Sequence, residues 1–67
     1  MNIQFNDQPL KLPTNWMTIS DLIQWKGINP QGTAVALNDK LVTRNQWTVK
    51  RLSEGDRITI ISAAFGG

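Results

Sequence analysis

The sequence predicts an α+β domain in which one main helix packs across one face of a single β-sheet. Three observations support this prediction. The length of 67 residues allows one small domain, apolar residues alternate near both ends of the chain, and one amphipathic helical segment lies between them. The predicted element order is β-β-α-β-β-β. One helix cannot cover both faces of a sheet, so the other face is left for solvent or a partner.

The first strands are predicted by alternation. Ile3 and Phe5 alternate with polar residues, which is the period of a half-buried strand. Residues 6–9, Asn-Asp-Gln-Pro, have the composition of a turn, and Leu10 and Leu12 then resume the alternation. Residues 3–12 therefore predict an opening hairpin.

The helix has start and stop signals. Thr18 and Asp21 have the spacing of a capping box, and Gly27 suits the left-handed position that ends a helix. The apolar residues between them form one stripe at helical spacing: Ile19, Leu22 and Ile23. This segment is too short to be stable alone, so it needs a sheet to pack against.

The second half of the chain predicts three more strands. They cover residues 33–37, 40–42 and 57–62, with turns at 38–39 and 53–56 and a short helical turn within 43–47. The segment 57–62 is the strongest strand because it is β-branched and alternating. Its alternation places Ile58 and Ile60 on one face and Thr59 and Ile61 on the other.

The composition argues against catalysis by this chain alone. The sequence has no Cys and no His, which removes the thiol nucleophile, the usual general base and the commonest metal ligands, so we expect no metal site. Its five acidic residues are scattered singly. The net charge of +2 is dispersed, which does not favour nucleic-acid binding. No apolar run approaches a membrane span and no signal peptide is visible, so we expect a cytoplasmic location.

The chain ends in Gly66-Gly67, directly after the strongest predicted strand. We expect residues 63–67 to form a flexible tail, which would reach roughly 17 Å when extended. Two residues without a Cβ can pass through a narrow slot and adopt any φ angle there. These properties suit a chain end that enters the active site of another protein.

Several motifs together resemble a known family. They are Ile3 and Phe5 followed by Asn6-Asp7, Thr18-Ile19 and Leu22-Ile23, Val35-Ala36-Leu37-Asn38, Val42-Thr43-Arg44-Asn45-Gln46-Trp47, Gly55-Asp56-Arg57-Ile58, and Gly66-Gly67. In order, spacing and chain length they are similar to the ThiS family, the small sulfur carrier proteins of bacterial thiamine (thiazole) biosynthesis. The resemblance spans the whole chain.

This resemblance implies a β-grasp (ubiquitin-like) fold, with a mixed sheet whose first and last strands pair in parallel at its centre. It implies one sulfur carrier domain over residues 1–67. It also implies that a ThiF-like adenylating enzyme uses ATP to activate the carboxylate of Gly67. A sulfur donor system then converts it to a thiocarboxylate, from which thiazole synthase (ThiG-like) takes the sulfur. The carrier itself would bind no cofactor.

Other side chains are candidates for partner contacts. We expect Ile61 and Phe65 to lie toward the partner. Arg44 could pair with an acidic group of the partner or satisfy a local carbonyl, and the sequence does not decide between these roles. Trp47 is expected to cap the core, because a lone aromatic in an irregular segment is usually buried, and Trp25 is expected to cover the core partly.

Two other functions fit the same sequence. One is a carrier like the small subunit of molybdopterin synthase, which also uses a terminal thiocarboxylate; the short length favours the thiazole branch. The other is a non-catalytic ubiquitin-like interaction domain in which the two terminal glycines are incidental.

Overall fold

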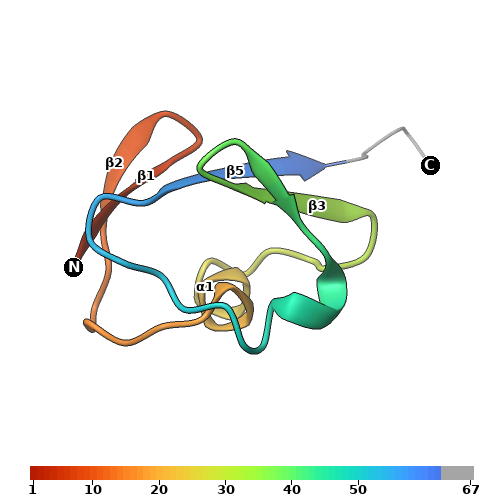
Figure 1. The fold of residues 1–67 in the computed structure, drawn as a ribbon, viewed down its shortest axis with the longest axis horizontal. Coiled ribbons are helices and arrows are strands. Elements are labelled where there is room, and N and C mark those ends of the chain that lie inside the picture. The colour runs from red at the N-terminus through yellow and green to blue at the C-terminus, as the bar shows by residue number, and fades with distance from the viewer. Residues whose placement is uncertain (63–67) are drawn as a thin grey trace.

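The computed structural model describes residues 1–62 (Figure 1). The elements in chain order are β1 (Asn2–Phe5), β2 (Gln8–Lys11), α1 (Ile19–Trp25), β3 (Thr33–Leu37), β4 (Lys40–Val42), the short 3₁₀ helix η1 (Arg44–Gln46) and β5 (Arg57–Ser62). These elements confirm the predicted order of strands and helix. The predicted flexible tail, residues 63–67, lies outside the described residues.

The strands form one sheet of five in the order β2-β1-β5-β3-β4. β1 and β5 are neighbours in parallel, and every other neighbouring pair is antiparallel. Helix α1 lies across one face of this sheet, whereas no helix within residues 1–62 covers the opposite face (Figure 1). A central parallel pair made by the first and last strands is the arrangement that a β-grasp fold requires.

Both hairpins close through two-residue turns with left-handed backbone. The central residues have φ angles from 50° to 72°: Asn6, Asp7, Asn38 and Asp39. Positive φ at both positions gives a turn whose twist matches that of the strands, and Asn and Asp tolerate it better than most residues. The first turn is shorter than predicted, because Pro9 belongs to β2. A proline is acceptable there since β2 is an edge strand, where its missing N–H costs no ladder bond.

Helix α1 has both predicted caps. Thr18 Oγ1 accepts the Asp21 N–H at 3.1 Å, and Asp21 Oδ2 accepts the Thr18 N–H at 3.0 Å. At the other end Gly27 has φ of 70°, and the Ile28 N–H donates to the Ile23 carbonyl at 3.0 Å. This last bond is the long-range bond of a Schellman motif. The caps provide hydrogen-bond partners for terminal N–H and C=O groups that have none within a helix of seven residues.

The core lies between α1 and the sheet. Its buried hydrophobic residues are Ile3, Leu12, Met17, Ile19, Leu22, Ile23, Val35, Leu37, Trp47, Leu52 and Ile58. The predicted burial of Trp47 is confirmed, and its indole N–H donates to the Val42 carbonyl at 3.1 Å. The expectation for Trp25 is wrong, since its side chain is 46% exposed. Trp25 lies beside the stripe of Ile19, Leu22 and Ile23, and it is not among the partly buried residues packed against the core.

Because β5 alternates between a buried and an open face, two matched substitutions test the packing. Ile58 is fully buried and Ile61 is 49% exposed. We expect Ile58→Val to lower the free energy of unfolding by about 1 kcal/mol, and Ile61→Val to change it by less than about 0.5 kcal/mol. Urea unfolding followed by circular dichroism measures both. Equal losses in the two variants would contradict the assignment of the faces.

Candidate functional site

Strand β5 leads to the chain end that the sequence singled out. It is the middle strand of the sheet, between β1 and β3. Its last residue, Ser62, pairs with Thr33 at the end of the sheet far from the N-terminus (Figure 1). Phe65, Gly66 and Gly67 lie outside the described residues. The described part of the site is therefore the strand that precedes them and the surface around it.

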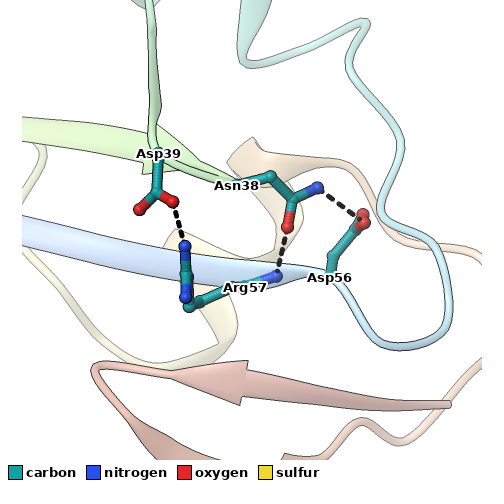
Figure 2. Close-up of polar contacts among 4 residues, drawn as sticks. All are labelled: Asn38, Asp39, Asp56 and Arg57. Carbon is teal, nitrogen blue, oxygen red and sulfur yellow. Dashed lines mark hydrogen bonds and ion pairs between the residues drawn. The ribbon is translucent and has the colours of Figure 1, made fainter.

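Side chains and main chain fix the start of β5 (Figure 2). The Arg57 N–H donates to Asn38 Oδ1 at 2.9 Å, and Asn38 Nδ2 donates to Asp56 Oδ1 at 3.1 Å. Asp56 Oδ2 also accepts the Ser53 N–H at 2.7 Å, which closes the turn predicted before β5. The Arg57 guanidinium pairs with Asp39. Both of these side chains are well exposed, so the ion pair contributes at most about 1 kcal/mol, and the bonds to the main chain do most of the positioning.

The face of the sheet opposite α1 carries an apolar strip that we call the open-face strip: Ala34, Ala36, Leu41, Thr59 and Ile61. The strand register brings these residues together, because Ala34 pairs with Ile61 and Ala36 pairs with both Thr59 and Leu41. Leu41 is 71% exposed. The two alanines of β3 are small, which leaves the larger side chains on either side of them accessible. The predicted placement of Ile61 on the face opposite Ile58 is thus confirmed, whereas its contact with a partner stays a prediction.

Arg44 lies near the end of the sheet at which β5 finishes. Its guanidinium donates to the Pro30 carbonyl at 2.5 Å and lies 4.9 Å from the ring centre of Trp47. The same carbonyl accepts the N–H of Thr33, the residue that pairs with Ser62. Arg44 therefore takes the local role that the sequence left open. One carbonyl bond uses only part of a guanidinium with five N–H donors, so a second role toward a partner is compatible with this contact.

The sequence did not predict two features of the sheet around β5. One is the part of the open-face strip on β3 and β4, which the small residues at positions 34 and 36 of an alternating strand could have indicated. The other is the set of side-chain bonds from Asn6 and Asn38 to β5. The Asn-Asp pairs were recognised as turn formers, but composition alone does not show which strand their side chains contact.

Residues 1–62 contain no group of three acidic, histidine or cysteine side chains close enough to hold a metal ion. No helix of the described chain is long and apolar enough to cross a membrane. The features that remain for function are the open-face strip, Arg44 and the strand that leads to the C-terminus.

Comparisons with known proteins agree on one family. The model of the ThiS family matches residues 3–67. The sulfur carrier protein ThiS of Escherichia coli (strain K12) is 31% identical, and the match covers the whole of both chains. The crystal structure of the thiamine biosynthesis protein ThiS from Geobacter metallireducens superposes with a TM-score of 0.89 at 19% identity, again over both full chains. The solution structure of a thiamine biosynthesis protein from the same organism gives a TM-score of 0.84 at 19% identity, over all of this chain and 88% of that one.

The structural likeness confirms the β-grasp fold, with its mixed sheet and single main helix. The family match and the full-length relative show which family the chain belongs to, and they agree with the motifs spread from Ile3 to Gly67. The chain therefore belongs to the ThiS family.

Proposed function

We propose that this chain is a sulfur carrier protein of thiamine biosynthesis whose reactive group is the main-chain carboxylate of Gly67. The observation that carries the proposal is the full-length ThiS match of a chain whose central strand β5 is followed by a Gly-Gly end. The Escherichia coli relative is named a sulfur carrier protein. In this role the chain is a co-substrate on which enzymes act, and not itself an enzyme.

The chemistry explains why partners are needed. A carboxylate is an anion at neutral pH, so it resists attack by a sulfur nucleophile and has no good leaving group. In the proposed first step a carboxylate oxygen of Gly67 attacks the α-phosphate of ATP, pyrophosphate leaves, and an acyl-adenylate forms. Sulfur at the level of hydrosulfide from a donor system then attacks the carbonyl carbon, AMP leaves, and the S–H proton is lost to solvent. The product is a terminal thiocarboxylate, from which thiazole synthase takes the sulfur.

The sequence supports the proposal that this chain carries the sulfur while partner proteins bind ATP and supply the sulfur. It has no cysteine, so sulfur has no side-chain thiol on which to travel. It also has no Gly-rich phosphate-binding motif, so we assign ATP to a ThiF-like adenylating enzyme. A ThiG-like thiazole synthase and a sulfur donor system complete the set of partners. The use of ATP leads us to place these reactions in the cytoplasm.

We further propose that Ile61, Phe65 and Arg44 contact the adenylating enzyme. Ile61 belongs to the open-face strip on the strand that leads to Gly67, so an enzyme that holds the chain end is well placed to cover this strip. An exposed aliphatic group of this kind gains free energy when a partner removes it from water. The guanidinium of Arg44 offers further donors for an acidic group near the end of β5.

The transfer of sulfur to the C-terminus can be tested directly. When the protein is incubated with ATP, a cognate ThiF-like enzyme and a sulfur donor, we expect a sulfur-for-oxygen mass gain located on the C-terminal peptide. Intact-mass spectrometry followed by peptide mapping measures it. The control omits ATP and should leave the mass unchanged. No gain with an active cognate enzyme would favour a non-catalytic interaction domain. Sulfur delivered to molybdopterin synthase rather than to thiazole synthase would favour the other carrier function.

A chain lengthened by one alanine after Gly67 tests whether the position of the carboxylate matters. We expect this variant to gain no sulfur, because one extra residue moves the carboxylate by roughly 3.5 Å, and a misplacement of about 1 Å can already lower a rate about 100-fold. Its urea unfolding midpoint should equal that of the wild type, since the addition lies beyond β5. Normal sulfur loading of the lengthened chain would contradict a reaction centred on the Gly67 carboxylate.

A charged substitution in the open-face strip tests whether the adenylating enzyme docks there. We expect Ile61→Asp to raise the KM of the adenylating enzyme for this protein about tenfold, because a carboxylate would have to be desolvated in an apolar contact. Val49→Asp is the matched control, since Val49 is also an exposed aliphatic residue, at 65%, but does not belong to the strip. Steady-state kinetics with varied carrier concentration measures both. Equal KM values for the two variants would show that the strip is not the docking surface.

A further inference from the structure

The side chain of Asn6 bonds to Ile60, in the C-terminal half of β5. Asn6 is the first residue of the left-handed turn after β1, with φ of 50°. Its Oδ1 accepts the N–H of Ile60 at 2.8 Å, although the two residues are 54 positions apart in the sequence. This bond joins the end of one hairpin to the strand that leads to Gly67.

The bond continues the parallel ladder between β1 and β5. Main-chain bonds run from Gln4 N to the Asp56 carbonyl and from Asn6 N to the Ile58 carbonyl, both at 2.9 Å. In a regular parallel ladder the next bond would run from Ile60 N to the main-chain carbonyl of Asn6. The left-handed turn directs the main chain away at that point, and the side-chain oxygen of Asn6 accepts the N–H instead.

The side-chain bond of Asn6 matters because the main-chain register of β1 with β5 ends at Ile58. The register pairs are Gln4 with Arg57 and Phe5 with Ile58. On the other side, β3 pairs with β5 as far as Ser62. Beyond Ile58, β5 is therefore hydrogen-bonded along its β3 edge by main chain and along its β1 edge by Asn6. A strand end bonded on one edge alone opens more readily than one bonded on both.

We propose that Asn6 is a positioning residue for sulfur loading. Its side chain holds the final residues of β5 against β1, and this fixes the point and direction from which the chain continues to Gly67. The inference rests on the proposed function, because only a chain end that must enter an enzyme needs a fixed point of departure. Asn6 touches no reacting atom in this scheme and acts through the strand.

The second hairpin contains a matched control. Asn38 is also the first residue of a two-residue left-handed turn, with φ of 50°. Its Oδ1 accepts the N–H of Arg57 at 2.9 Å, while its own N–H donates to the Arg57 carbonyl at 2.8 Å. Both asparagines thus accept a main-chain N–H of β5 through Oδ1, and Asn38 Nδ2 donates in addition to Asp56 Oδ1 at 3.1 Å. They differ in place, since Arg57 is the first residue of β5 and Ile60 lies near its end.

Glycine is the informative replacement at both positions. It accepts positive φ without strain, so Asn6→Gly and Asn38→Gly keep the turns and remove only the side chains. Both variants also gain similar backbone freedom in the unfolded state. Asn6→Asp keeps an oxygen acceptor in the same place and serves as the conservative variant. Sulfur-loading kinetics with the ThiF-like enzyme and amide hydrogen exchange on the free protein are measured for all three variants and the wild type.

We expect Asn6→Gly to speed amide exchange at Ile60 roughly two- to tenfold beyond any global change, which is the effect of losing one hydrogen bond. We also expect it to lower kcat for thiocarboxylate formation by about tenfold while KM changes less than about twofold, because orientation of the reacting group is lost and the docking surface is kept. Asn6→Asp should restore both values. Asn38→Gly should leave kcat and exchange at Ile60 close to wild type.

Equal losses of kcat in Asn6→Gly and Asn38→Gly, or an unchanged kcat in Asn6→Gly, would overturn the proposal and leave Asn6 a turn residue. The proposed function and the role of Asn6 are refuted by different results. A wild-type chain that gains no sulfur with an active enzyme would refute the proposed function, whereas unchanged exchange at Ile60 in Asn6→Gly would refute the anchor whatever the activity.

Discussion

The parallel pairing of β1 with β5 is the constraint on which the rest of the structure depends. Two strands at opposite ends of the chain can pair in parallel only if the chain between them crosses from one end of the sheet to the other, and α1 provides much of that crossing. The ladder itself is short, because β1 turns away after Phe5. Burial of Ile3 and Ile58 beneath the helix stabilises the pair, and the turn residues extend its hydrogen bonding.

Strand β5 therefore has a core face and an open face. Ile58 packs in the core, whereas Thr59 and Ile61 face the side of the sheet that α1 leaves uncovered. A domain of 67 residues with one main helix cannot bury both faces, so an exposed sheet surface is a consequence of its size. In the proposed function the partner enzymes recognise the continuation of β5, so this surface lies next to the segment that they receive.

Local features of the sequence predicted most of the elements. The capping box of Thr18 and Asp21, the stripe of α1 and the alternation of β5 each depend on near neighbours, and all three are confirmed. The parallel order of the strands followed from the family resemblance, because periodicity does not specify which strands pair. The bonds from Asn6 and Asn38 to β5 could not be predicted from composition. They exist only once β5 pairs with β1 on one side and with β3 on the other, which brings residues 54 and 19 positions apart into contact.

The acidic side chains show how structure and chemistry are separated in this chain. Of its five acidic residues, four make bonds that hold the fold: Asp21 caps α1, Asp39 pairs with Arg57, Glu54 accepts the Asn2 N–H, and Asp56 closes the turn before β5. With no cysteine or histidine in the sequence, sulfur has no thiol or imidazole side chain to carry it. In the proposed function the main-chain carboxylate of Gly67 carries the sulfur instead, and its activation comes from the partner enzyme that receives the chain end.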